Sequence, residues 1–188
     1  MSAPTYLAKG THVLQASEWI DQRLGAGTFQ KLVAEAGASW SSPMPMLWYD
    51  LDVLLRVITV VARRLGTTVE AVTTEVARRN AQHDLKTVYR VFLRILRPVV
   101  VLGFMPRMWE TYFRFGSVHV ITNEPRLFVL VTRGIPTRFL GWLRGGWAGF
   151  LPETIRVAGG QNVSLRMSDP EPDLTQGLHR VKVHAIYR

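Results

Sequence analysis

The sequence predicts an α+β domain in which N-terminal helices pack on a C-terminal antiparallel sheet with one inserted helix. Through most of the first half, apolar residues recur three or four positions apart, which is typical of the buried face of a helix. From residue 117 onward, short segments of alternating apolar and polar residues are separated by Gly, Asn and Pro, which is typical of strands joined by turns. An aromatic-rich segment from residue 136 interrupts these strands and has helical spacing instead.

The start of the chain carries the weakest pattern. We expect residues 1–16 to form a loosely ordered lead-in and residues 17–188 to form one α+β domain. Ser17 is suited to cap the first helix, and a second helical piece is predicted over residues 29–37.

The next helices have stronger start signals. Asp50 or Asp52 can begin a helix whose apolar face covers residues 51–65. Thr67 and Glu70 have the spacing of a capping box, in which each side chain binds a backbone N–H of the other residue. This pair predicts the start of a further helix.

Two more helices are predicted before the sheet begins. The helix that starts at Thr67 is expected to end near Gln82, and the next one to begin near Asp84. Pro106 is suited to a first helical position, and Gly116 to closing that helix in a left-handed conformation. The aromatic helix between them joins the helical half to the sheet.

The sheet is predicted as a hairpin followed, after the inserted helix, by three closing strands. The hairpin pairs residues 117–122 with 126–132 across an Asn-Glu-Pro turn. The inserted helix begins at Pro136 and is expected to stop near Gly149. The closing strands are placed at residues 155–157, 163–167 and 181–187.

Composition excludes several kinds of function. The 188 residues include no cysteine, so disulfides, thiolate metal sites and cysteine nucleophiles are excluded. We expect a cytoplasmic location, because the N-terminus does not resemble a signal peptide and no apolar run approaches the ~20 residues of a membrane span. The formal net charge of +9 favours nucleic acid, anionic lipid or acidic protein as partners, although arginine-rich composition alone also produces such a charge.

Several short motifs occur in a defined order. They are Trp48-Tyr49-Asp50, then Pro106, Met108-Trp109, Phe113 and Gly116, then Gly141-Trp142, and finally the segment 157–163. In this order they resemble the superfamily that contains haem-nitric-oxide-binding domains, 4-vinyl-reductase domains and TRAPP vesicle-tethering subunits. The resemblance is closest to an uncharacterised bacterial branch and covers approximately residues 20–188.

What the resemblance implies differs between its branches. Haem-binding members hold haem with an axial histidine and a Tyr-x-Ser-x-Arg motif, and that motif is absent here, so we expect no cofactor and no haem. The vinyl-reductase branch implies a small apolar ligand, and TRAPP-like members imply dimerisation and a bound fatty chain. We therefore expect a protein partner, a homodimer by analogy, and at most a noncovalent apolar ligand.

Five aromatic residues are candidates for the wall of a ligand cavity between the helices and the sheet. Such cavities are mostly apolar with a few polar anchors. The same helical spacing also fits an ordinary hydrophobic core, and the sequence leaves both interpretations open. The candidates are Trp109, Tyr112, Phe113, Trp142 and Trp147.

Four basic residues share the outward parity of the predicted closing strands, and they are candidates for binding an anion or a partner. They are Arg156, Arg166, Arg180 and Lys182. On neighbouring strands they would form one basic patch, which could also be an ordinary solvated face. Without interleaved aromatic residues, the patch gives little support to single-stranded nucleic acid as its ligand.

The sequence contains no recognisable catalytic or metal-binding motif. Three histidines can bind zinc where the fold makes them converge, but His179 and His184 are five residues apart and point to opposite faces of one strand, so we interpret His119, His179 and His184 as surface histidines. No nucleophile, nucleotide-binding or dinucleotide fingerprint is present. We therefore predict a non-enzymatic regulatory or assembly module that binds protein partners and is gated by a small apolar ligand. The alternatives are a protein that binds nucleic acid or anions through a basic sheet face and, with less support, a haem-based gas sensor.

Overall fold

The computed structural model describes residues 6–40, 42–87 and 97–188. The helical half contains β1 (Leu7–Lys9), α1 (Gly10–Leu24), α2 (Thr28–Glu35), β2 (Trp48–Asp50), α3 (Leu51–Arg64) and α4 (Val69–Thr87). After residue 96 follow α6 (Pro98–Gly103), α7 (Met105–Tyr112), β3 (Ser117–Glu124), β4 (Leu127–Pro136), the short 3₁₀ helix η1 (Thr137–Phe139), α8 (Leu140–Val157), β5 (Ser164–Met167), β6 (Glu171–Pro172) and β7 (Leu178–Ile186).

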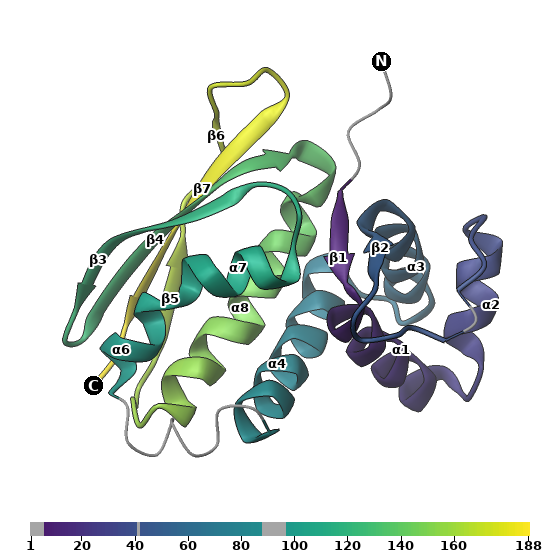
Figure 1. Ribbon diagram of the computed structural model, residues 1–188, viewed down its shortest axis with the longest axis horizontal. Coiled ribbons are helices and arrows are strands. Elements are labelled where there is room, and N and C mark those ends of the chain that lie inside the picture. The colour runs from purple at the N-terminus through teal and green to yellow at the C-terminus, as the bar shows by residue number, and fades with distance from the viewer. Residues whose placement is uncertain (1–5, 41, 88–96) are drawn as a thin grey trace.

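The helices pack in layers against one antiparallel sheet, which confirms the predicted α+β fold class. The antiparallel sheet has the strand order β3-β4-β7-β5, with β6 paired to β7. Helices α6, α7 and α8 lie on one face of this sheet, α4 packs along α8, and α1 to α3 lie farthest from the sheet (Figure 1). The inner face of β7 shows the alternation that this arrangement requires, because Val181, Val183 and Ala185 are fully buried while Arg180 and Lys182 are exposed.

Glycine allows α8 to lie very close to α4. A Cβ atom at Gly145 would lie 2.3 Å from the carbonyl oxygen of Glu70, and one at Gly149 would lie 2.1 Å from that of Thr74. We predicted that the helix stops near Gly149, and this is wrong. The glycine is there to fit against the neighbouring backbone, and the helix continues to Val157.

Because α8 continues, the strand predicted over residues 155–157 is also wrong. Ile155 is fully buried on the helix and Arg156 pairs with Glu153 one turn away. The strand that we predicted over residues 163–167 is confirmed as β5, and the predicted hairpin is confirmed as β3 and β4. Gly116 takes a left-handed conformation but does not close α7, which ends at Tyr112.

The N-terminal region is more ordered than its sequence pattern indicates. Within the expected lead-in of residues 1–16, β1 pairs with β2, and α1 begins at Gly10 rather than at Ser17. A residue larger than glycine would not fit here, because a Cβ at Gly10 would lie 1.8 Å from the carbonyl oxygen of Met44. Burial of Val13 and Ala16 holds this first turn in place without a side-chain cap.

Two further helix starts can be compared with the predictions. Asp50 caps α3 through a 2.8 Å hydrogen bond that its Oδ1 accepts from the backbone N–H of Asp52, as expected. The cap of α4 is Thr68, whose Oγ1 accepts from the N–H of Ala71, and not Thr67. Helix α4 passes the predicted end near Gln82, and the helix predicted from Asp84 falls mainly on residues outside the described ones. Among the described residues, no helix has the length and apolar character needed to cross a bilayer.

Candidate functional site

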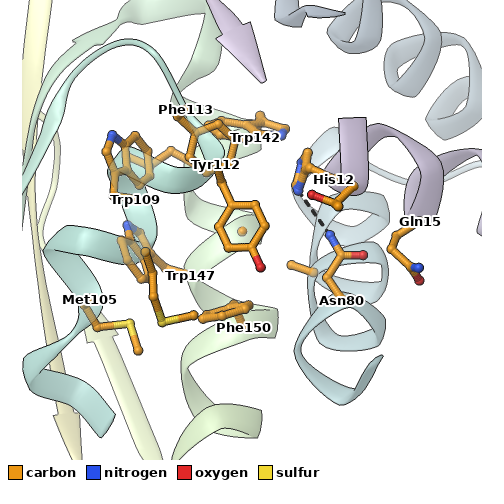
Figure 2. Close-up of a pocket in the computed structure, with 15 residues that line it drawn as sticks. His12, Gln15, Asn80, Met105, Trp109, Tyr112, Phe113, Trp142, Trp147 and Phe150 are labelled. Carbon is orange, nitrogen blue, oxygen red and sulfur yellow. Dashed lines mark hydrogen bonds between the residues drawn. The ribbon is translucent and has the colours of Figure 1, made fainter. Parts of the chain in front are cut away.

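A cavity of about 80 Å³ lies between α1, α4, α7 and α8. Its wall is almost entirely apolar, and Figure 2 shows the aromatic side chains of α7 and α8 facing His12 and Asn80 across it. All five predicted aromatic residues belong to this wall. The lining residues are Thr11, His12, Gln15, Ala77, Asn80, Met105, Met108, Trp109, Tyr112, Phe113, Trp142, Leu143, Gly146, Trp147 and Phe150.

The rings on the aromatic side of the cavity pack on one another and are hydrogen-bonded to the surrounding fold. Trp109 stacks on Trp147 with ring centroids 6.1 Å apart and an interplanar angle of 20°, and Phe113 packs at 4.6 Å from Trp109. Each of these two indole N–H groups has a partner: that of Trp109 donates to the carbonyl oxygen of Phe115 at 2.8 Å, and that of Trp147 to Thr132 Oγ1 at 2.9 Å. These bonds fix the ring orientations, so the space beside them is defined by the fold.

The opposite side carries a polar pair. The ring Nδ1 of His12 lies 3.1 Å from the side-chain Nδ2 of Asn80, and the imidazole packs edge-on against Phe113 and Trp142. Burial among these groups disfavours the charged imidazolium and lowers the pKa of His12 to about 4. At neutral pH the cavity therefore presents a neutral imidazole.

Unpartnered polar atoms concentrate in the residues that line the cavity. Asn80 Oδ1, Gln15 Oε1 and Trp142 Nε1 are buried and have no hydrogen-bond partner among the described residues, and Thr11 Oγ1 shares this property. Buried polar groups are almost always paired, because each unpaired one costs roughly 1–3 kcal/mol. Four such atoms therefore belong to residues around one apolar space.

The sequence analysis did not identify His12, Gln15 and Asn80. His12 and Gln15 lie in the segment that we expected to be a lead-in, where no regular pattern was recognised. Asn80 lies on α4, and only the approach of α1 to α4 brings it to His12, 68 residues earlier in the chain. One signal was available: His12, Gln15 and Trp19 are spaced like one face of a helix.

The predicted basic patch is only partly assembled. The pairing of β5 with β7 places Arg166 opposite His184, on the outer face that also carries Arg180 and Lys182. Arg156 is separated from them because it belongs to α8 and pairs with Glu153 at 3.3 Å. The other charged neighbours of Arg180 and Lys182 come from β4 and from the segment around β6.

The histidines of the sheet make local contacts. His119 Nε2 lies 2.9 Å from Ser117 Oγ, and His179 Nε2 lies 2.9 Å from Thr137 Oγ1. Within residues 6–40, 42–87 and 97–188, no three His, Asp or Glu side chains converge in a way that could hold a metal ion.

The fold is shared by solved structures of H-NOX domains. An oxygen-binding H-NOX domain related to soluble guanylate cyclases, in its oxygen complex, matches with a TM-score of 0.72 at 14% identity, over 96% of this chain and 95% of that one. A point mutant of the T. Tengcongensis H-NOX matches with a TM-score of 0.73 at 15% identity, over 96% and 97%. A third, described as modulating heme redox potential through protein-induced porphyrin distortion, matches with a TM-score of 0.70 at 15% identity, over 95% and 99%.

No family model matches the chain, and no curated protein matches it in sequence. At this level of identity the structural likeness establishes the fold alone, and that fold is the one seen in the H-NOX domains. The likeness corrects our expectation that no cofactor, and haem in particular, is involved. Structures that share this fold over almost the whole chain concern haem and its porphyrin, so haem has to be counted as a candidate cofactor.

Proposed function

We propose that this chain is a non-catalytic, ligand-responsive domain, and that the aromatic cavity takes a small apolar molecule carrying one hydrogen-bonding group. The observation that carries this proposal is the set of unpartnered polar atoms around an apolar space, notably Asn80 Oδ1 and Trp142 Nε1. A ligand with a donor or acceptor would pair with them after a small shift of either side chain.

The size of the cavity limits the ligand. A closed apolar cavity of roughly 150 Å³ in another protein holds benzene or xenon, and pockets for drug-sized molecules measure roughly 300–1,000 Å³. At about 80 Å³, this cavity suits a molecule of very few non-hydrogen atoms unless the aromatic side chains move.

The composition of the wall argues against catalysis. Among the described residues, no carboxylate and no lysine or arginine lines the cavity. General acid–base catalysis needs a positioned proton donor or acceptor, and one with a pKa near the working pH is most effective. His12, with a pKa of about 4 and a neutral amide as its partner, has neither an orienting carboxylate nor a suitable pKa.

Helix α7 links the wall of the cavity to the N-terminal strand β1 and to the edge strand β3 of the sheet. Trp109 and Phe113 line the cavity, and the next residue, Arg114, donates its backbone N–H to the carbonyl oxygen of Leu7 in β1 at 2.9 Å. Since α7 also leads directly into β3, a ligand that moves Trp109 would shift both the N-terminal strand and the sheet edge. We propose that a protein partner, or a second copy of the chain, reads this shift, as expected of a signalling or assembly module.

Haem is the second candidate ligand, favoured by the structures that share the fold and by His12. A neutral imidazole is the commonest side-chain ligand of metals in proteins, so the donor chemistry fits. The space does not fit, because 80 Å³ is far below what a tetrapyrrole occupies and Trp109, Trp147 and Phe113 fill the surroundings. In this arrangement of the side chains the cavity does not accommodate haem, which would enter only if the aromatic side chains moved.

Native mass spectrometry of the protein purified from its source tests the proposal, because it detects a retained molecule and the oligomeric state together. A matched variant is Gly146→Ala, since a methyl group there meets no atom within 4 Å and would stand in the open space beside the cavity. We expect the retained molecule to be lost or bound more weakly in G146A while the fold persists. Equal retention by both proteins would show that the molecule binds elsewhere.

Titration with haem separates the two candidates. A Soret band that appears with the native chain and is absent in His12→Ala would identify haem as the ligand and His12 as its iron ligand, and would replace the small-molecule proposal. Protein that stays colourless in the presence of haem leaves the small apolar molecule as the ligand to identify.

A further inference from the structure

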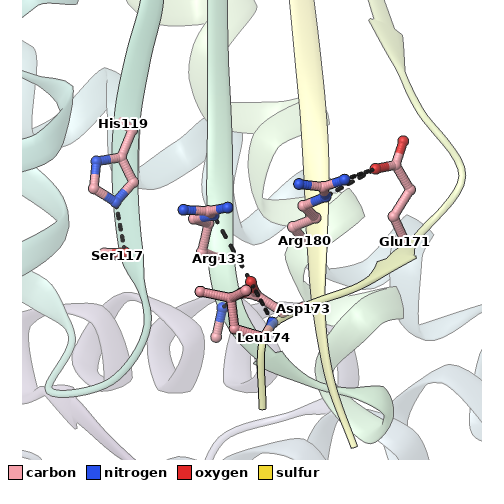
Figure 3. Close-up of polar contacts among 8 residues, drawn as sticks. Ser117, His119, Arg133, Glu171, Asp173, Leu174 and Arg180 are labelled. Carbon is pink, nitrogen blue, oxygen red and sulfur yellow. Dashed lines mark hydrogen bonds and ion pairs between the residues drawn. The ribbon is translucent and has the colours of Figure 1, made fainter. Parts of the chain in front are cut away.

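A second hollow lies on the opposite face of the sheet, where no helix of the described residues packs. It is a groove of about 470 Å³, within the size range of ligand pockets, lined by His119, Ile121, Val131, Arg133, Glu171, Arg180 and Lys182. These side chains come from β3, β4, β7 and the segment that includes β6 (Figure 3). Three of the seven are cationic at neutral pH and one is a carboxylate.

The sheet register brings two arginines together. Thr132 pairs with Val181 and Ile135 with His179, so the bulged residues Arg133 and Gly134 stand opposite Arg180. Like charges directly opposite each other on neighbouring strands destabilise a sheet. An anion between the two strands removes that penalty, and two of the three carboxylates of residues 168–177, those of Asp173 and Glu171, lie beside these arginines.

One of these carboxylates is a fixed part of the fold. Asp173 accepts hydrogen bonds from the backbone N–H groups of Gly134 at 2.8 Å and of Leu174 at 2.9 Å, and its side chain is only 9% exposed. These bonds lower its pKa, and Arg133 adds a weaker effect from 3.8 Å. Asp173 therefore anchors the segment and only loosely engages Arg133.

The other carboxylate is held weakly. Glu171 accepts from Nε and Nη2 of Arg180 at 2.8 Å, but both side chains are about half exposed, and exposed ion pairs contribute little to stability. Its backbone belongs to the two-residue strand β6, which follows Pro170 and ends with Pro172, and neither proline has an N–H to donate to a ladder. Glu171 is placed as a counterion that another anion can replace.

Lys182 adds a cation that lacks an ion pair among the described residues. It follows Arg180 by two residues on the same strand, so the two side chains share a face roughly 7 Å apart along the strand. His119 lies in the same cross-strand row, because both His119 and Lys182 pair with Val131. With Glu171 displaced, Arg133, Arg180 and Lys182 would surround the groove, and arginine forks match phosphate oxygens well.

We propose that this groove binds a small phosphate-bearing anion between Arg133, Arg180 and Lys182, and that Glu171 is the intramolecular counterion that the anion replaces on Arg180. The site is independent of the aromatic cavity, which lies on the other side of the sheet. Release of Glu171 breaks only the side-chain bond between β6 and Arg180, while the pairing of β6 with β7 and the bonds of Asp173 keep the segment in place.

Isothermal titration of the full chain with inorganic pyrophosphate at low ionic strength tests the site. We expect Arg180→Gln to weaken binding by about tenfold or more, because it removes charge-assisted hydrogen bonds. Glu171→Gln should instead tighten binding several-fold, because the competing carboxylate is gone. The matched control is Arg156→Gln, which removes the same formal charge from α8, outside the groove, and should change the affinity less than about twofold.

Circular dichroism of each variant confirms that its fold is retained, and E171Q keeps the test decisive even where R180Q is poorly folded. Pyrophosphate binding that is equal in the native chain, E171Q and R180Q would refute the site. Vesicles of phosphatidylglycerol, compared with phosphatidylcholine, distinguish the source of the phosphate. Binding to the anionic vesicles without any binding of pyrophosphate would overturn the assignment to a small soluble ligand.

Discussion

Replacing His12 with glutamine should make the protein resist mild acid better. Burial lowers the pKa of His12 from 6.5 to about 4, and the imidazole contacts the uncharged side chains of Asn80, Phe113 and Trp142. In the unfolded chain the imidazole regains its ordinary pKa, so the unfolded state binds more protons whenever the pH lies below about 6.5. Acid therefore favours unfolding of the native chain.

The magnitude follows from the two pKa values. Relative to neutral pH, His12 should reduce the free energy of unfolding by about 2 kcal/mol at pH 5 and about 3 kcal/mol at pH 4. Glutamine keeps a group that can bond to Asn80 but does not titrate. Because the acid-dependent loss disappears in the variant, the free energy of unfolding of His12→Gln relative to the native chain should rise by these amounts as the pH falls.

Urea unfolding of both proteins from pH 4.5 to 7.5, followed by tryptophan fluorescence, gives the difference in free energy directly, and the contributions of other titrating groups cancel in it. Direct measurement of the imidazole pKa by NMR provides an independent check. A difference that stays constant across this range would refute the assignment of His12 as a buried neutral imidazole, and with it the chemistry we give to the cavity.

Three further predictions concern the packing that shapes the two sites. Gly149→Ala should lower the free energy of unfolding by roughly 1–3 kcal/mol in urea titrations, because a Cβ there would lie 2.1 Å from the carbonyl oxygen of Thr74. The control G146A should be neutral or stabilising. Equal effects of the two substitutions would contradict the close contact between α4 and α8. Trp147→Phe should cost at least about 1–3 kcal/mol by leaving the buried Thr132 hydroxyl unpaired, and a double-mutant cycle with Thr132→Val should show coupling between the two side chains. Asp173→Asn should lower the free energy of unfolding by about 1 kcal/mol at pH 7. Because the folded-state pKa of Asp173 is lowered, the difference in stability between the native chain and the variant should close as the pH falls below about 4. A difference that persists in acid would argue against an ionised Asp173.

The elements with a regular local pattern could be predicted from sequence. The 3.6-residue spacing of α3, the cap at Asp50 and the alternation along β7 each depend on neighbours within a few residues. The five aromatic wall residues were found for the same reason, since α7 and α8 each carry them on one face. Whether they surround a ligand site stays a prediction.

The errors occurred where a distant segment decides the local structure. Gly149 signals a helix end when read alone, and only the backbone of α4 explains why glycine is needed inside a helix there. Gly10 and His12 likewise make sense only once β2 and α4 lie beside them. No local window contains these partners, so periodicity and propensity could not reveal the polar half of the cavity.

Two consecutive residues of strand β4 contribute to the two sites on opposite faces of the sheet. Thr132 points inward and receives the indole N–H of Trp147, which holds one wall of the cavity, while Arg133 points outward into the basic groove. Since side chains alternate along a strand, a slip of one residue in the pairing of β4 would exchange the two faces and destroy both sites together. The bulge opposite Arg180 falls immediately after Thr132, so it leaves the cavity wall in register and redirects only the outward cations. The arrangement of the cavity and that of the groove therefore depend on the same few residues of β4.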